Sequence, residues 1–150
     1  MIKKLTLTTI ALLLSMTNTV SHATDFGTEE EARSMIARAI NLVKSDKNRA
    51  LDAFTNLQGG FGYKDLYVFC FDKNAILVAH PTVLGDDASE LTDPDGVKIW
   101  SLVSSVKQDE IKKITYKLER FTSGSAAVHI KTSFITQVDG IHCGVGFYAE

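Results

Sequence analysis

A regular apolar stripe begins a short way into the chain and extends over residues 28–57. Its apolar positions recur every three or four residues, the spacing of one buried helix face: Ala32, Met35, Ile36, Ala39, Val43, Ala50, Phe54 and Leu57. Thr28 and Glu31 match a capping box at its start. The polar interval 44–49 keeps the same register. The pattern therefore predicts one long helix, or two in line, ended by the glycine pair at 59–60.

Five later segments have the patterns of β-strands. They span residues 66–72, 76–80, 112–121, 126–138 and 142–149. The first is apolar on both faces, which is typical of a strand at the centre of a sheet. Residues 72–74 predict a turn into the second strand, and Pro81 ends that strand because proline cannot donate a hydrogen bond to a sheet. The connections at 122–125 and 139–140 have the composition of hairpin turns.

A short helix is predicted between the second and third strands. Asp93 resembles an N-cap, with Pro94 at the first helical position. One apolar face follows, formed by Ile99, Leu102, Val103 and Val106. The order of all these elements predicts an α+β domain in which helices cover one antiparallel sheet.

The N-terminus has the organisation of a secretory signal peptide. Lys3 and Lys4 are followed by an uncharged run over residues 5–16, and small residues stand at Ser21 and Ala23. The run is shorter than the ~20 apolar residues that span a bilayer. We therefore predict a cleaved signal peptide at residues 1–23 and one periplasmic or secreted domain at residues 24–150, without a membrane anchor.

The charge of the exported part argues against nucleic-acid binding. Removal of Lys3 and Lys4 lowers Lys plus Arg from 16 to 14, against 18 Asp plus Glu, so the net charge becomes −4. A protein that binds nucleic acid needs clustered cations to displace counterions, whereas these lysines are scattered.

No pattern of catalytic or metal-binding residues is evident. Asp86, Asp87, Asp93 and Asp95 do not have the spacing of a calcium loop, and the histidines lack the spacing of a zinc site. There is also no nucleophile elbow and no phosphate-binding glycine loop. The sequence therefore predicts a protein that is not an enzyme and that needs no metal or cofactor.

Several short motifs occur in a characteristic order along the chain. They are Leu66-Tyr67-Val68-Phe69-Cys70-Phe71-Asp72, Ala79-His80-Pro81, Gly85, Asp93-Pro94-Asp95-Gly96, Tyr116-Lys117, Lys131 and Gly144-Val145-Gly146-Phe147-Tyr148. Together with the long N-terminal helix, this order resembles the single Cache domains, extracytoplasmic relatives of the PAS fold that sense ligands. The resemblance implies a long helix packed on five antiparallel strands, with the first and last strands side by side.

The resemblance also implies a pocket for a small organic molecule, often a short carboxylate such as acetate, propionate, pyruvate or lactate. Candidate ligand-binding residues are Tyr67, Phe69, His80, Trp100, Tyr116 and Lys131. Each has a simpler interpretation. The aromatic side chains suit ordinary core packing, and His80 suits the end of a hairpin. Lys131 alternates with the apolar Val128, Ile130 and Phe134, which favours a lysine that faces solvent at least as much as a buried one.

The two cysteines, Cys70 and Cys143, lie in predicted strands. From the residues alone, they are either small buried apolar groups or a disulfide. The resemblance places them on adjacent strands and on one face, which makes a disulfide geometrically possible. It also places Tyr67, Phe69 and Phe71 beside Gly144 and Gly146 of the last strand, whose missing side chains leave room for rings or for a ligand.

Three functional hypotheses follow. The first is an exported binding or sensing module that acts with a separate membrane receptor or kinase. The second is an interaction protein that uses the fold as a scaffold, as a homodimer through the N-terminal helix. The third is a small exported enzyme or enzyme accessory, for which the sequence offers no reactive group.

Overall fold

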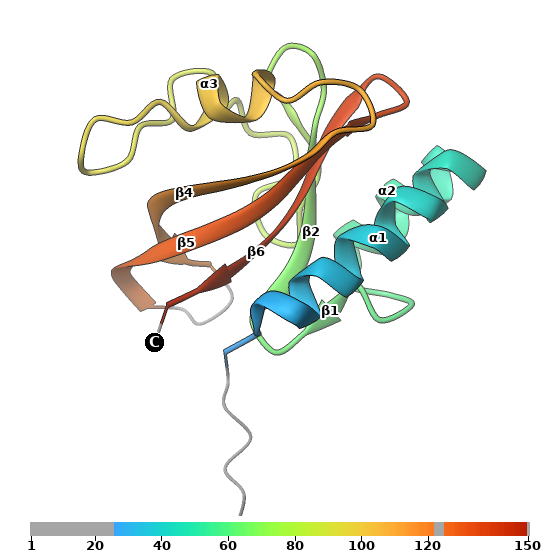
Figure 1. Ribbon diagram of the computed structural model, residues 1–150, viewed down its shortest axis with the longest axis horizontal. Coiled ribbons are helices and arrows are strands. Elements are labelled where there is room, and N and C mark those ends of the chain that lie inside the picture. The colour runs from blue at the N-terminus through green and yellow to red at the C-terminus, as the bar shows by residue number, and fades with distance from the viewer. Residues whose placement is uncertain (1–25, 122–124, 150) are drawn as a thin grey trace, which may run out of the picture.

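The computed structural model describes residues 26–121 and 125–149, in which two helices cover one face of a curved antiparallel sheet and a loop-rich layer covers the other (Figure 1). The helices are α1 (Glu29–Ser45), α2 (Lys47–Thr55) and α3 (Ile99–Ser104). The strands are β1 (Gly62–Tyr63), β2 (Leu66–Phe71), β3 (Leu77–Ala79), β4 (Ile111–Arg120), β5 (Ser125–Val138) and β6 (Ile141–Tyr148). The predicted signal peptide and residues 122–124 of the turn predicted at 122–125 lie outside the described residues.

The first and last long strands are neighbours at the centre of the sheet. The strand order is β1-β2-β6-β5-β4, and β3 pairs with β2 along the same edge as β1. The predicted α+β fold with a PAS-like strand order is therefore confirmed, with the two-residue strand β1 as an addition. In this order, β2, β6, β5 and β4 form one continuous surface on each side of the sheet.

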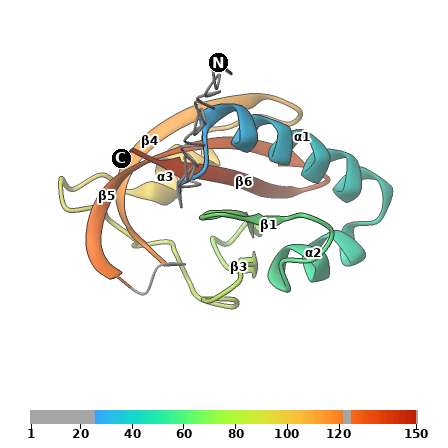
Figure 2. The same ribbon diagram turned by 90° about the horizontal axis from the view of Figure 1, so that it is seen from below.

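The N-terminal helical region differs from its prediction. The helix ends at Ser45, because Asp46 has an extended backbone (φ −158°) and its side chain accepts the Arg49 N–H. Asp46 thus caps both helices, and Figure 2 shows that α2 turns back beneath α1 instead of continuing in line. The capping box of Thr28 and Glu31 is present as predicted.

The short helix α3 also begins later than predicted. Asp93 caps no helix, because its carboxylate accepts the N–H groups of Asp95, Val97 and Lys117. The bond to Lys117 fixes the loop to β4, and the chain enters the helix only at Ile99. The Asp93-Pro94 signal therefore marks a turn that anchors the loop-rich layer on the sheet.

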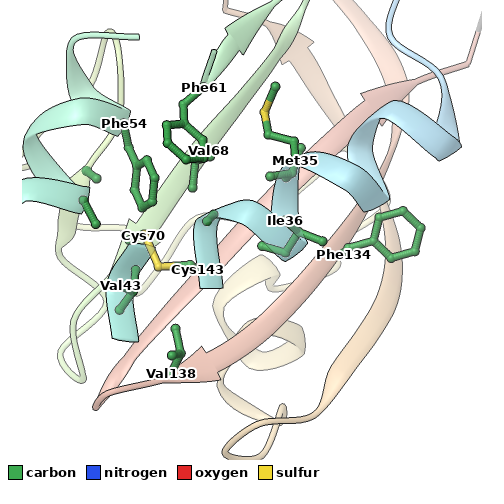
Figure 3. Packing of buried hydrophobic residues seen from close by; sticks show 14 of the residues in the cluster. Met35, Ile36, Val43, Phe54, Phe61, Val68, Cys70, Phe134, Val138 and Cys143 are labelled. Carbon is green, nitrogen blue, oxygen red and sulfur yellow. A yellow bond between two sulfur atoms is a disulfide. The ribbon is translucent and has the colours of Figure 1, made fainter. Parts of the chain in front are cut away.

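Side chains of β2 alternate between two cores, one on each face of the sheet. Val68 and Cys70 point to the helices and belong to one buried cluster with Ile36 of α1 and Phe54 of α2 (Figure 3). Cys70 and Cys143 are register partners on this face and form a disulfide. The rings of Tyr67, Phe69 and Phe71 point to the opposite face, toward α3 and the loops. The candidate site lies on that second face.

Candidate functional site

A cavity of about 180 Å³ lies between the sheet and the loop-rich layer. Strands β2, β3, β4 and β5, the start of α3 and the segment 80–91 contribute to its wall. Its lining residues are Tyr67, Phe69, Phe71, Leu77, His80, Val83, Asp86, Asp87, Ala88, Leu91, Ile99, Tyr116, Leu118, Phe121 and Lys131. The wall is mainly apolar and aromatic, with a few polar groups, which is the usual composition of a small-molecule site.

Lys131 is buried at this cavity and does not face solvent. Its side chain is 1% exposed, whereas the apolar Val128 and Ile130 are 46% and 50% exposed. The strand alternates as expected, but the helices pack on β5 only from about Phe134 onward. On the helix face of β5, the part before Phe134 is therefore not covered, which leaves Val128 and Ile130 exposed. Lys131 points to the opposite, cavity face, where it is enclosed.

The ammonium group of Lys131 lacks a counter-ion in the part of the chain that the structure describes. Its Nζ donates a hydrogen bond to Tyr67 Oη (2.9 Å) and lies over the rings of Tyr67, Phe69 and Tyr148, at 4.5, 5.2 and 5.0 Å from their centroids. No carboxylate forms an ion pair with it within residues 26–121 and 125–149. Burial lowers the pKa of Lys131 to about 7, against a smaller opposing effect of Asp65.

His80 is held as a neutral hydrogen-bond donor. The backbone N–H groups of Thr82 and Val83 donate to its Nδ1, at 3.1 and 3.2 Å. These bonds need the Nδ1 lone pair, so the ring proton is on Nε2. Burial and the charge of Lys131 lower the pKa of His80 to about 4, which keeps the ring neutral at physiological pH. The ring also packs against Tyr67 and Phe121.

Two tyrosines add neutral hydroxyl groups to the cavity wall. Tyr116 shares a hydrogen bond with Ser133 (3.0 Å), and burial raises the pKa of Tyr116 to about 12. Burial also raises the pKa of Tyr67, whose hydroxyl accepts from Lys131. An ammonium has three donors and Lys131 uses one of them on Tyr67, so two remain for a bound molecule.

The sequence can now be placed among known proteins. The family described as Single Cache domain 2 matches residues 1–149, nearly the whole chain. The chain belongs to this family. Cache domains are extracytoplasmic sensor domains that bind ligands. Among curated proteins, none is significantly similar in sequence to this chain.

Solved structures share the Cache fold at low sequence identity. A methyl-accepting chemotaxis protein from Vibrio parahaemolyticus is 19% identical, with a TM-score of 0.62 over 79% of this chain and 86% of its own. A periplasmic sensor domain of a chemotaxis protein is 24% identical, with a TM-score of 0.59 over 81% of this chain and 90% of its own. A Cache chemosensory domain that recognises a carboxylic acid is 21% identical, with a TM-score of 0.57 over 81% and 88%. At this identity the likeness establishes the fold.

Five of the six predicted site residues line the cavity of this Cache domain, and Trp100 does not. Tyr67, Phe69, His80, Tyr116 and Lys131 are among its lining residues. Trp100 packs instead against the rings of Phe71 and His142, with centroids 5.6 Å apart in both cases. Its neighbour Ile99 lines the cavity, because successive helix residues point about 100° apart.

The glycines of β6 make room for side chains of the wall. A Cβ atom at Gly144 would collide with Phe69 and Ile135, and one at Gly146 would collide with Lys131 and Ser133. The room that the resemblance implied for rings or for a ligand is therefore taken by side chains of the protein, among them the ring of Phe69. Gly146 allows the aliphatic part of Lys131 to lie flat on β6, which places the ammonium group at the cavity.

Sequence reasoning missed most of the apolar wall. Phe71 was placed on the face of Phe69 but was not among the candidate residues. Leu118 could have been found in the same way, because it lies two residues from Tyr116 on one strand and shares its face. The wall residues of the loop-rich layer, among them Val83 and Leu91, have no such periodicity. Within the described ranges there is no group of three or more metal-binding side chains and no helix long and apolar enough to cross a membrane.

Proposed function

We propose that this Cache domain binds a short monocarboxylate in the cavity, outside the cytoplasm, and passes its ligand state to a separate membrane partner. The observation that carries the proposal is the buried ammonium of Lys131, which has no counter-ion among the described residues. A buried charge is costly unless an opposite charge or several hydrogen bonds compensate it. A ligand carboxylate supplies that opposite charge.

The remaining polar groups suit the same ligand. Two N–H donors of Lys131 and the Nε2–H of His80 can replace the hydrogen bonds that a carboxylate loses when it leaves water. Among the described residues that line the cavity, Lys131 is the single buried cation, so a second carboxylate on the ligand would stay unpaired. This arrangement favours monocarboxylates over dicarboxylates.

The size of the cavity sets the length of the ligand. Its volume of about 180 Å³ is close to the ~150 Å³ of an engineered cavity that admits benzene. The ligand therefore has room for a carboxylate and a short tail of a few atoms. Phe69, Phe71 and Leu77 offer this tail an apolar contact surface.

The comparisons support the proposal at the level of the fold. One structural neighbour recognises a carboxylic acid, and two others come from chemotaxis proteins. A sensor domain of a chemotaxis protein passes its ligand state to other parts of a receptor. We propose the same for this domain, with the membrane component on another protein.

A thermal-shift screen tests the proposal. Residues 24–150, freed of co-purified ligand by unfolding and refolding without reductant, are mixed at about pH 6 with acetate, propionate, lactate, pyruvate, succinate, amino acids and amines. A ligand at 100 times its Kd adds about 2.7 kcal/mol, or several degrees for a domain of this size. We expect a shift from at least one monocarboxylate, and a smaller one or none from succinate.

Variants connect the shift to the cavity. Lys131→Met should abolish the monocarboxylate shift, whereas Lys112→Met should keep it, because Lys112 is an exposed strand lysine outside the cavity wall. A shift that survives in Lys131→Met, or shifts from amines only, would contradict the proposal.

A further inference from the structure

We propose that ligand binding is coupled to the uptake of a proton, so that the cavity takes up a carboxylate and a proton together. The inference rests on the proposed function and concerns the regulation of the same site. In the empty cavity, Lys131 is mainly a neutral amine above about pH 7. The bound state pairs its ammonium with the ligand carboxylate, and the additional proton comes from the solvent.

The groups that face Lys131 from neighbouring strands are all neutral. They are Tyr67 on β2, Tyr116 on β4 and Tyr148 on β6; the last two are the register partners of Lys131. His80, which follows β3, is neutral because its Nδ1 accepts two backbone N–H groups. None of these groups can compensate an ammonium as a carboxylate does.

The charged groups farther from Lys131 already have other interactions or are solvated. Asp65 accepts the Gly27 N–H (2.6 Å), and its second oxygen pairs with Arg120 Nη2 (3.2 Å). Asp86 and Asp87 line the cavity but are exposed to solvent, which screens their charge. The empty cavity therefore favours the neutral amine, in agreement with the pKa of about 7 for Lys131.

A bound carboxylate reverses this preference. It brings a full negative charge to hydrogen-bond distance of Nζ in an enclosed site, which stabilises the ammonium and raises the pKa of Lys131. The balance is amine plus proton plus carboxylate anion, giving an ammonium–carboxylate pair. One N–H bond forms as the amine lone pair takes up the solvent proton, and no bond of the ligand changes. Lys131 is the acceptor of the proton, since protonation of His80 would break the bonds from Thr82 and Val83.

The consequence is a sensor whose affinity depends on pH. Below about pH 6 the lysine is already charged, so the affinity is constant and no proton is taken up. Above about pH 7 the affinity should fall by about tenfold per pH unit, because each binding event must first protonate the amine. The site therefore responds to a carboxylate most strongly in neutral and mildly acidic surroundings.

Calorimetric titration measures this coupling directly. The protein is titrated with acetate, propionate, lactate and pyruvate at about pH 5.5 and about pH 8, each in two buffers that differ in ionisation enthalpy. The difference in binding enthalpy between the buffers gives the number of protons taken up. We expect about none at pH 5.5, about one at pH 8, and an affinity about tenfold lower at pH 8.

The outcomes separate the inference from the proposed function. Binding at both pH values with equal affinity and no proton uptake overturns the inference and leaves the proposed function intact. If none of the four carboxylates binds even at pH 5.5, the proposed function fails and the inference fails with it.

Two variants identify the group that takes up the proton. Lys112→Met should retain uptake at pH 8. Lys131→Arg carries a guanidinium that stays protonated, so any binding by this variant should occur without proton uptake. Uptake of about one proton by Lys131→Arg at pH 8 would assign the proton to another group and overturn the inference. If Lys131→Arg does not bind, the wild-type titrations alone decide.

Discussion

The two faces of the sheet use the same strands for opposite purposes. On the helix face, β2 and β6 contribute Val68, Val145 and the disulfide of Cys70 and Cys143, all of them fully enclosed. On the cavity face, the alternate positions of β2 contribute the rings of Tyr67, Phe69 and Phe71, and β5 contributes the enclosed Lys131. One face stabilises the fold, and the other encloses a lysine whose ammonium form lowers stability until a ligand carboxylate compensates the charge. The comparison shows how a small domain can tolerate a costly binding group.

The largest expected effect comes from the buried charge on the cavity face. Between about pH 7 and 10.5 the unfolded chain holds a proton on Lys131 that the folded protein has released, so stability should rise with pH across this range. The difference between the pKa of Lys131 in the unfolded chain, 10.5, and in the folded protein, about 7, corresponds to about 5 kcal/mol of unfolding free energy. Lys131→Met should lack this rise and should be more stable than the wild type at neutral pH, as measured by urea unfolding from about pH 6 to 9.5. Parallel curves for the two proteins would show that the lysine is not buried.

The next effect belongs to the helix face. The double variant Cys70→Ala, Cys143→Ala should lose about 2–5 kcal/mol of unfolding free energy, because the disulfide closes a long loop of the chain. Its affinity for a carboxylate should be that of the wild type, since both sulfur atoms lie on the face opposite the cavity. As a control, the difference in stability between the two proteins should shrink when unfolding is measured in a reductant, because the wild type then loses its cross-link too. A loss of affinity without a loss of stability would contradict the division between the faces.

A smaller effect is expected from His80 in acid. The pKa of His80 is about 4 in the folded protein and 6.5 in the unfolded chain, so stability is lost as the pH falls through this range, by about 3 kcal/mol in total. His80→Asn provides a side-chain oxygen that can accept from the Thr82 N–H but does not titrate. This variant should lose less stability than the wild type between about pH 6.5 and 4, measured by chemical unfolding. An equal loss in both proteins would mean that the imidazole is not the group responsible.

The smallest expected effect is at Trp100. Trp100→Phe retains an aromatic ring against Phe71 and His142 and changes no residue of the cavity wall. Its Kd for a carboxylate, measured by calorimetry, should match that of the wild type. A marked loss of affinity would mean that Trp100 belongs to the binding site, as the sequence predicted.

Much of the fold could be predicted because strands and hairpins leave local signals. The predicted strand boundaries agree with β2 to β6 within one residue at each end. Asp139 and Gly140 form the turn between β5 and β6 with positive φ values of 47° and 78°, as their residue types indicate. Two helices in line were one of the predicted alternatives, but the position of the break at Asp46 and the change of direction there were missed. The apolar register continues across Asp46, and periodicity alone does not show that an aspartate caps a second helix.

The site was harder to predict, and Lys131 shows why. Its place in the alternation was evident, but which face of β5 is enclosed depends on how far the helices extend over the sheet. The resemblance to the Cache family indicated Lys131 as a candidate, but only its packing in the structure shows that the side chain is buried. Trp100 shows the opposite case, in which a plausible aromatic residue on the correct element points past the cavity.

The most direct test of the account is a crystal structure of the protein with a bound monocarboxylate, obtained at about pH 6, where Lys131 is largely protonated. The account predicts density for the ligand in the cavity, with a carboxylate oxygen about 2.7–2.9 Å from Lys131 Nζ and its tail against Phe69 and Phe71. A ligand that places its carboxylate away from Lys131, or that binds on another surface while this cavity stays closed to it, would contradict the central claim.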